Sequence, residues 1–315
     1  MFCKDVKEDN PAVSKIKDAL ENIGFFYISN HGLNPEELQS SLELSRTFFR
    51  LPTEVKKKSA RSSVVNSVGY VEIGVENLDD YDPKLTDLKE AMDITVNEPH
   101  PFYSHNNWPS EEALPHWKEG VKELFIKLEK IGNALVTAFA VALGEKADFL
   151  SSWYIPTSNS LVRLLRYPPT PPEESGTIGC GAHSDYGLAT LLIQDAVGGL
   201  QILYKDKWID ATPIPGTLVI NVGDCMEYLT NGAFKATKHR VINKSSEVDR
   251  HVCLMFYEPD YNMPMTVVER FKDRPENLMW PRTATFGEHL QRRLGATYTF
   301  HPNPETTKET KPPSQ

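Results

Sequence analysis

Apolar residues in the first half of the chain recur at the three- and four-residue spacing that is typical of amphipathic helices. An Asn-Pro dipeptide, which combines a capping side chain with a first-turn proline, begins two such stretches. We predict a helix from Pro11 to about Gly24 and a second helix over 35–49. A longer helix is predicted over 117–143. The apolar segment GFFYIS, at 24–29, lies between the first two helices and predicts a short strand.

The second half of the chain has a different pattern, because short apolar runs rich in β-branched and aromatic residues follow Asn159. Clusters of Gly, Pro, Asn and Asp separate these runs and mark the turns between strands. Regularly spaced short strands of this kind are typical of a closed or double-sheet architecture, so we predict a mixed α and β fold with a jelly-roll core. The runs are LVRLLRY (161–167), LATLLIQ (188–194), LQILY (200–204), TLVINV (217–222) and HVCLMFYE (251–258).

The composition limits the classes of protein to which the chain can belong. With 315 residues and 40% apolar composition, the chain is long enough for a globular protein with a sizeable core. The 34 Lys and Arg residues against 43 Asp and Glu residues give a net charge of -9, which argues against nucleic acid or anionic membranes as partners. No apolar run approaches the roughly 20 residues that span a bilayer, so we expect no membrane association.

The four cysteines, Cys3, Cys180, Cys225 and Cys253, are far apart and lack the paired spacing of a structural zinc site. No secretory signal precedes them, because the chain starts with the charged segment MFCKDVKEDN. We therefore expect reduced thiols and a cytoplasmic protein. The sequence leaves the oligomeric state open and is compatible with a monomer.

His183 and Asp185 stand at the end of an extended segment, where the two-residue period of a strand points both side chains to the same side. A single His-x-Asp pair is also explained by a polar turn, but His239 supplies a second imidazole further along the chain. Two histidines and one carboxylate suit ferrous iron for oxygen chemistry, whereas a closed zinc site usually has four protein ligands. Cys180 is offset by three from His183, so we expect it on the opposite face as a packing residue.

Arg250 begins a strand whose two-residue period places it on one face with Val252, Leu254 and Phe256. If that face lines the protein interior, the guanidinium needs a carboxylate partner, which arginine binds through two parallel hydrogen bonds. A strand-end arginine paired at the surface is the alternative interpretation.

The run LVRLLRY has the same two-residue period and places Arg163 and Tyr167 on one face. We expect both side chains to face the same pocket. A buried structural pair explains them equally well.

Over about residues 13–298, the chain contains segments that resemble a known family. The family is the isopenicillin N synthase-like branch of the iron(II)/2-oxoglutarate-dependent dioxygenase superfamily. The N-terminal segments that carry the resemblance are GFFYISNHGL (24–33), FFRLPTEVKKK (48–58) and DLKEAMDI (87–94). The later segments are LVRLLRYPP (161–169), GAHSDYGLATLLIQDAVGGLQI (181–202), INVGDCMEYLTNGAFKATKHRVI (220–242) and HLQRRLGATY (289–298). So many matches in the same order argue against a chance resemblance.

The resemblance implies a double-stranded β-helix core wrapped by an N-terminal helical region. His183, Asp185 and His239 are similar to the family's iron ligands. Arg250 is similar to the arginine that binds the distal carboxylate of 2-oxoglutarate, and Tyr167 to a tyrosine that contacts co-substrate or substrate. The implied reaction uses Fe(II), 2-oxoglutarate and O2 to hydroxylate a small organic substrate with release of succinate and CO2. Desaturation or cyclisation are further outcomes of the same chemistry.

Two features depart from the family pattern. The chain begins almost directly at its first helix, where family members usually carry a short apolar strand, so we expect a missing edge strand or a truncated sequence. The family's Arg-x-Ser is Arg250-x-Val252 here, and valine cannot donate the serine's hydrogen bond. Two alternative functions stay open: an isopenicillin N synthase-type Fe(II) oxidase that uses no 2-oxoglutarate, and a catalytically idle binding module on the same scaffold.

We divide the chain into an N-terminal helical dioxygenase region at 1–155, the β-helix core at 156–262, a C-terminal helical segment at 263–300 and a disordered tail at 301–315. The tail prediction rests on a Pro-, Thr- and Lys-rich composition with almost no apolar content. The sequence does not identify the substrate, because loops supply many of the pocket residues in such a fold.

Overall fold

The computed structural model of the chain describes residues 10–62, 67–78, 87–95, 100, 102–103, 105–154, 158–170, 178–242 and 244–297. The predicted tail and the segment ahead of the first helix lie outside these residues. The helices are α1 (Pro11–Asn22), α2 (Pro35–Phe49), α3 (Thr53–Lys57), α4 (Trp117–Ala142), α5 (Asp224–Leu229) and α6 (Phe286–Thr297), with the short 3₁₀ helices η1 (Ser151–Tyr154) and η3 (Glu269–Phe271).

The two predicted N-terminal helices begin at their capping residues. Asn10 accepts a hydrogen bond from the Ala12 amide at 2.9 Å at the start of α1. At α2, the Asn34 side chain accepts from the Glu37 amide and the Glu37 carboxylate accepts from the Asn34 amide, each at 2.8 Å. This reciprocal capping box satisfies two backbone donors that a helix start leaves unpaired. The long helix predicted over 117–143 is confirmed as α4.

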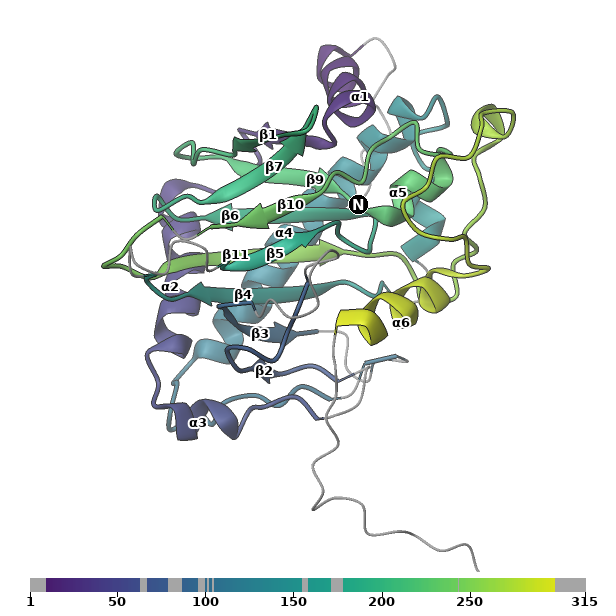
Figure 1. The fold of residues 1–315 in the computed structure, drawn as a ribbon. Coiled ribbons are helices and arrows are strands. Elements are labelled where there is room, and N and C mark those ends of the chain that lie inside the picture. Colours follow the sequence, from purple (N-terminus) through teal and green to yellow (C-terminus); the bar gives the residue numbers. More distant parts are fainter. Residues whose placement is uncertain are drawn as a thin grey trace, which may run out of the picture.

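Two antiparallel sheets form the β core (Figure 1). The larger sheet has seven strands in the order β1-β9-β6-β11-β4-β3-β2, and the smaller has four in the order β5-β10-β7-β8. The predicted mixed α and β fold corresponds to these sheets and the helices around them. The strands are β1 (Phe25–Ile28), β2 (Tyr70–Val71), β3 (Glu90–Ile94), β4 (Leu161–Tyr167), β5 (Cys180–His183), β6 (Ala189–Gln194), β7 (Leu200–Tyr204), β8 (Lys207–Asp210), β9 (Leu218–Val222), β10 (His239–Val241) and β11 (Arg250–Tyr257).

The part of the chain that was predicted to be helical contributes three strands to the larger sheet. β1 pairs with β9, and β3 pairs with β4 and β2. The sequence pattern predicts β1 but misses the other two, because β2 has only two residues and β3 is buried throughout, without alternation. The N-terminal region and the core therefore share one sheet.

Each face of the larger sheet has its own core. Along β11, Met255 and Tyr257 belong to the core on the helical side, whereas Val252 and Leu254 belong to the core that includes the smaller sheet. The helices α2 and α4 cover the first face (Figure 1). Gly132 lets α4 approach closely, because a Cβ there would lie 2.5 Å from the Tyr257 ring. The space between the two sheets is therefore lined by even-numbered residues of β11.

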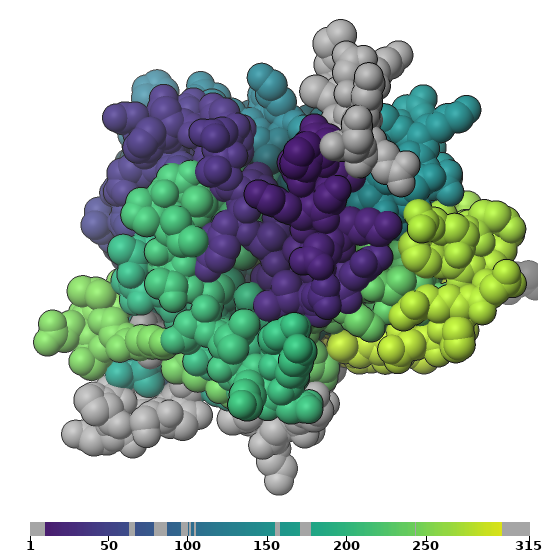
Figure 2. Space-filling view, turned by 90° about the horizontal axis from the view of Figure 1, so that it is seen from above, coloured from purple at the N-terminus to yellow at the C-terminus, as the bar shows by residue number. Residues whose placement is uncertain are grey.

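The N-terminal helix is part of the same body. It contacts α4 and β1, and in the view from above the purple N-terminal segment lies directly against green core segments (Figure 2). Among the helices that the structure describes, none combines the length and apolar character that crossing a membrane requires.

Candidate functional site

Two histidines meet across the smaller sheet. His183 is the last residue of β5 and His239 is the first residue of β10, and the two are Cα partners in the antiparallel pairing. Their ring centroids lie 4.4 Å apart, and each residue is only 8% exposed. Strand pairing thus brings together two predicted ligands that are far apart in the sequence.

Asp185 joins the two histidines from the loop after β5. Its Oδ1 atom lies 3.8 Å from His183 Nε2 and 3.6 Å from His239 Nε2. Its Oδ2 atom accepts hydrogen bonds from Thr190 Oγ1 at 2.5 Å and from Asn221 Nδ2 at 2.7 Å. The two oxygens therefore differ in role: neutral donors hold Oδ2, and Oδ1 faces both imidazoles.

In the imidazole rings of His183 and His239, hydrogen bonding leaves Nε2 as the nitrogen with a free lone pair. His183 Nδ1 lies 2.7 Å from the Gly181 carbonyl oxygen, and His239 Nδ1 lies 3.2 Å from the Thr237 carbonyl oxygen. Because a carbonyl oxygen only accepts, Nδ1 carries the hydrogen in each ring. Burial, together with the nearby His239, lowers the pKa of His183 to about 3, which keeps that ring neutral at physiological pH.

The carboxyl group of Asp185 is held in its ionised form. Burial acts to raise the pKa of Asp185, but the two histidines and the hydrogen bonds to Oδ2 outweigh burial and lower the pKa. One ligand atom from each of the three residues lies within 4.8 Å of the others. Two imidazole nitrogens, one carboxylate oxygen and no thiolate suit a divalent iron that keeps coordination positions open.

A buried polar network fixes the loop that carries Asp185. Ser184 donates to Asp224 Oδ1 at 2.7 Å, and the Asp224 amide donates to the Asp185 carbonyl at 2.9 Å. From α6, Arg293 Nε and His289 Nε2 approach Asp224 Oδ2 at 3.3 and 3.1 Å. The C-terminal helix therefore helps to position a ligand-bearing loop that lies far from it in the sequence.

The prediction that Cys180 lies on the opposite face from His183 is wrong, because β5 contains a bulge. His239 pairs with His183 and Val241 pairs with Cys180, so a step of three residues in β5 opposes a step of two in β10. Cys180 Sγ consequently lies 3.8 Å from His183 Nδ1. That nitrogen is the one already bonded to a carbonyl, so the thiol contacts the ring edge away from Nε2.

A cavity leads from the three candidate ligands along β11 and β4, and Tyr167, Arg250 and Val252 line it. Arg250 is 1% exposed, and its guanidinium carbon lies 4.9 Å from the centre of the Tyr167 ring. Arg250 Nη2 lies 3.4 Å from Gln194 Oε1, whereas Nε and Nη1 have no hydrogen-bond partner among the described residues. The predicted face is confirmed, since all four even-numbered residues of β11 line this cavity.

A buried guanidinium with unused donors fits a carboxylate ligand. Leaving such donors unpaired in the interior costs about 1–3 kcal/mol or more, and arginine can bind both oxygens of a carboxylate at once. Two other cations line the described part of the cavity: Lys89, which forms ion pairs with Glu76 and Asp87, and Arg163, which forms an ion pair with Asp93. Arg250 is therefore the cation that is placed to bind an anionic ligand here.

Comparisons with known proteins agree with this geometry. The sequence model of the 2OG-Fe(II) oxygenase superfamily matches residues 158–259, and that of the non-haem dioxygenase in morphine synthesis N-terminal region matches residues 2–111. A 2-oxoglutarate-dependent dioxygenase of Didymella fabae is 31% identical over 262 residues, which are 78% of each protein. This chain belongs to the 2OG-Fe(II) oxygenase superfamily.

Two further proteins resemble this oxygenase over most of its length. Homoarginine-6-hydroxylase of Oryza sativa subsp. japonica is 31% identical over 296 residues, covering 90% of this chain and 88% of that protein. The crystal structure of a full-length Neurospora crassa protein with α-ketoglutarate (2-oxoglutarate) and thymine matches with a TM-score of 0.80 and 28% identity, covering 90% of both chains. The protein is therefore an Fe(II)/2-oxoglutarate-dependent dioxygenase with the jelly-roll core of its superfamily, and neither alternative function is supported.

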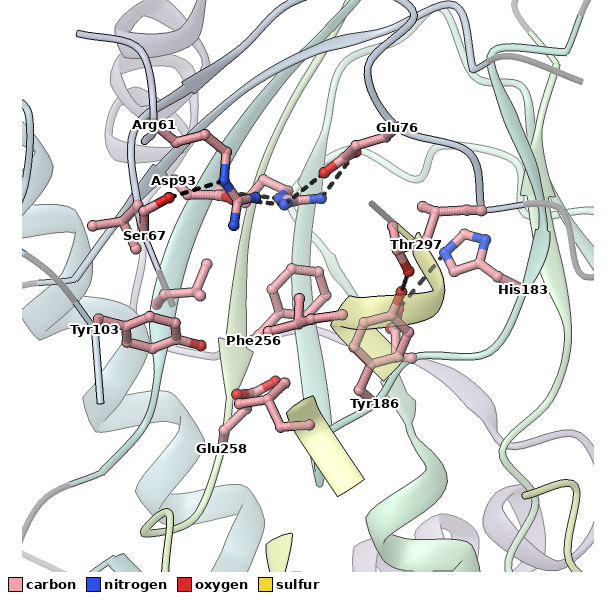
Figure 3. A pocket seen from close by; sticks show the side chains of 17 residues that line it. Arg61, Ser67, Glu76, Asp93, Tyr103, His183, Tyr186, Phe256, Glu258 and Thr297 are labelled. Atoms are coloured by element: carbon pink, nitrogen blue, oxygen red, sulfur yellow. Dashed lines mark hydrogen bonds and ion pairs between the residues drawn. The ribbon is translucent and has the colours of Figure 1, made fainter. Parts of the chain in front are cut away.

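A second cavity of the dioxygenase is lined by the candidate ligands His183 and Asp185. Figure 3 shows His183 at one end of it. Arg163 lines both cavities. Tyr167 also lines the first cavity, as predicted for two residues on the same face of a strand. Its Nε and Nη2 atoms bind the two carboxylate oxygens of Asp93 at 2.6 Å each. Arg163 thus faces the pocket and is also part of a buried structural pair.

Several charged residues of these cavities were not predicted from the sequence, and Glu258 and Lys89 are two of them. Glu258 extends the two-residue period of β11 beyond Phe256, so the alternation that predicted the position of Arg250 contains the signal for Glu258 as well. Lys89 directly precedes β3, where continuous burial removes any alternation. Only the tertiary structure shows that Lys89 faces the interior.

Glu258 gives a testable pH dependence. Burial raises its pKa to about 8, well above the usual glutamate value of about 4.3. The stability contributed by the protonated carboxyl is therefore complete below about pH 4 and is lost as pH rises through about 8. We expect the melting temperature of Glu258→Gln, relative to wild type, to rise between pH 5 and pH 9 in thermal melts of metal-free protein. A pH-independent difference would show that Glu258 ionises alike in the folded and unfolded chains.

Proposed function

We propose that His183, Asp185 and His239 bind Fe(II) in this dioxygenase through the two Nε2 atoms and Oδ1. The observation that supports this assignment best is the position of Oδ1, which faces both Nε2 atoms while Oδ2 is occupied by neutral hydrogen-bond donors. Bound iron, with 2-oxoglutarate and O2, supplies the oxidising chemistry that hydroxylates a C–H bond and releases succinate and CO2. The side chains of this chain hold the metal, orient the ligands and shield them from bulk water.

We further propose that Arg250 binds the distal carboxylate of 2-oxoglutarate and that Tyr167 holds the guanidinium in place. The unpaired Nε and Nη1 atoms of Arg250 and its contact with the Tyr167 ring support these roles. A carboxylate that accepts both hydrogen bonds would satisfy these donors in the interior. Arg250 and the candidate iron ligands line one cavity, which supports a co-substrate that contacts both.

Hydroxylation of a small organic molecule is the reaction that we propose. The rice relative is named for homoarginine and the Neurospora structure holds thymine, so relatives at similar identity bind chemically different molecules. The substrate of this chain therefore has to be inferred from the side chains of its own second cavity.

We also keep the division at 1–155, 156–262 and 263–300 as a proposal, supported by the separate matches of the two family models. A cytoplasmic location is proposed as well. It is supported by Cys180, Cys225 and Cys253, which are buried and free.

Removal of one proposed iron ligand should abolish turnover and leave the fold largely intact. The reason is that each ligand contributes one of three metal bonds but little apolar burial. In Asp185→Ala and His239→Ala we expect loss of bound iron and of 2-oxoglutarate-dependent succinate formation, with an unchanged circular dichroism spectrum. Cys180→Ala is the matched control and should keep its iron, because its thiol contacts the other edge of the His183 ring. Normal iron binding by either ligand variant would contradict the assignment.

Arg250→Ala should weaken 2-oxoglutarate binding by roughly 2–4 kcal/mol, or about 30- to 1000-fold, because a charge-assisted pair is lost and a carboxylate remains unpaired. The measurement is anaerobic titration of 2-oxoglutarate into Fe(II)-loaded protein, followed by the weak visible band of the iron chelate. Arg250→Lys should bind with intermediate affinity, since lysine keeps the charge but lacks the planar fork.

Arg240→Ala is the control for Arg250, because Arg240 stacks on Trp208 at 4.2 Å and does not line either cavity. Unchanged 2-oxoglutarate affinity in Arg250→Ala would assign the carboxylate to another residue.

Val252→Thr should strengthen 2-oxoglutarate binding by about 0.5–2 kcal/mol, because it offers a hydroxyl to the charged carboxylate without changing the β-branched shape. Val252 is 1% exposed and lines the cavity with Arg250. Calorimetric titration of 2-oxoglutarate and thermal melts should be run on the same samples.

Val219→Thr is the matched control, since Val219 is a buried strand valine of the same core that does not line the cavity. It should lower the melting temperature without strengthening binding, because it buries a hydroxyl among apolar groups. If Val252→Thr behaves like this control, Val252 serves only packing.

A further inference from the structure

The second cavity of the dioxygenase is lined by more carboxylates than cations. Apart from the candidate iron ligand Asp185, two positive side chains oppose three negative ones. They are Arg61 and Arg163 against Glu76, Asp93 and Glu258. The surplus is one carboxylate.

Four of these side chains form a network with one another. Arg163 binds Asp93 through two contacts of 2.6 Å and approaches Glu76 Oε1 at 3.1 Å. Arg61 Nη1 lies 3.9 Å from Asp93 Oδ2. Two cations are thus matched by two carboxylates, and Glu258 is the group that the network leaves out.

Glu258 is buried without a charged partner. It is 3% exposed, it forms no ion pair with any residue that the structure describes, and its Oε2 atom has no hydrogen-bond partner within that part of the chain. Figure 3 shows Glu258 on the other side of the cavity from Asp93 and Glu76, with Phe256 between them. The carboxyl group of Glu258 therefore faces the cavity from the wall opposite Asp93 and Glu76.

Packing on both sides fixes Glu258 in this position. Gly187, two residues after Asp185, is in close contact with it: a Cβ there would lie 2.7 Å from Glu258 Cγ and 2.9 Å from Oε1. On the other side, the Glu258 amide donates to Ser160 Oγ at 2.9 Å, and its carbonyl accepts from Ser158 Oγ at 3.1 Å. The Glu258 side chain therefore packs directly against the loop that carries Asp185.

A buried carboxyl group without a cationic partner favours binding of a ligand that supplies the missing positive charge. Burial raises the pKa of Glu258, so the group without a ligand holds a proton that an entering cation can displace. The cation would then make charge-assisted hydrogen bonds away from water, where they are strong. Tyr103 and Phe256 line the same cavity and offer aromatic rings, which also favour cations.

We propose that the substrate carries a cationic nitrogen, an ammonium or guanidinium group, that binds Glu258 while the carbon to be hydroxylated faces His183 and Asp185. All three residues line one cavity, so one small molecule can reach both ends. The inference rests on the proposed function, because the proposed iron site defines the end of the cavity at which the substrate reacts. A neutral amide or carbonyl group bound by a protonated Glu258 is the competing arrangement.

Two matched pairs of probes separate charge from shape. n-Butylguanidinium is compared with n-butylurea, and L-homoarginine with L-homocitrulline, because each pair keeps the shape and removes the positive charge. Dissociation constants are measured by calorimetric titration into protein loaded anaerobically with Fe(II) and 2-oxoglutarate. The variants are Glu258→Gln and, as control, Glu227→Gln, since Glu227 is also buried but lines neither cavity.

In wild type, the cationic member of at least one pair should bind about 10- to 100-fold more tightly than its neutral counterpart. Glu258→Gln should remove that preference, because glutamine keeps the size and the hydrogen-bonding groups but not the charge. Glu227→Gln should retain it. The iron chelate band should be unchanged in both variants, which shows that any loss of binding is not a loss of metal or co-substrate.

Three outcomes would overturn the inference: equal binding within both pairs, a preference for cations that survives in Glu258→Gln, or no binding of either cationic probe. If the iron chelate band forms in wild type while one of these outcomes is found, the substrate class is rejected and the proposed function stands. If wild type gives no band, the iron and co-substrate assignments fail, and the substrate inference fails with them.

Discussion

The pairing of β10 with β5 is the constraint on which the site depends, because it places His239 opposite His183. Side chains alternate along a strand, so a slip of one residue would turn His239 away from the other ligands. β10 has only three residues, but β7 on its other side fixes the register, with His239 opposite Ile202. Phe25 of β1 packs edge-on against the His239 ring at 5.3 Å and links the larger sheet to the same position.

Most charged side chains that line the two cavities form ion pairs with one another. Among the described lining residues, Arg250 and Glu258 form no such pair, and they lie at opposite ends of one strand. Arg250 begins β11 and Glu258 follows its last residue, so the two are separated by eight residues or about 26 Å of extended chain. Both lie on the face that lines the cavities, and the candidate iron ligands border each cavity. One strand therefore carries Arg250 toward the first cavity and Glu258 toward the second cavity.

Buried polar groups without partners destabilise a fold, so their positions need support from elsewhere. Arg250 is supported by the Tyr167 ring and by burial on both sides of β11, and Glu258 is supported by Gly187 and two serine hydroxyls. The larger core between the sheet and the helices contains the apolar packing that offsets this cost. The fold thus separates a stabilising face of the sheet from a face that lines the two cavities.

Features that act over a few residues follow from the sequence without the structure. Asn10 and Asn34 mark helix starts because a cap bonds amides within three positions, and the face shared by Arg250 and Val252 follows from the two-residue period of a strand. The same period contained the signal for Glu258. Three other features are visible only in the folded chain: which side of β5 carries Cys180, how Lys89 and Arg163 are paired, and which described carboxyl group of the second cavity forms no ion pair. They depend on strand register and on contacts between residues far apart in the chain, and no local pattern encodes them.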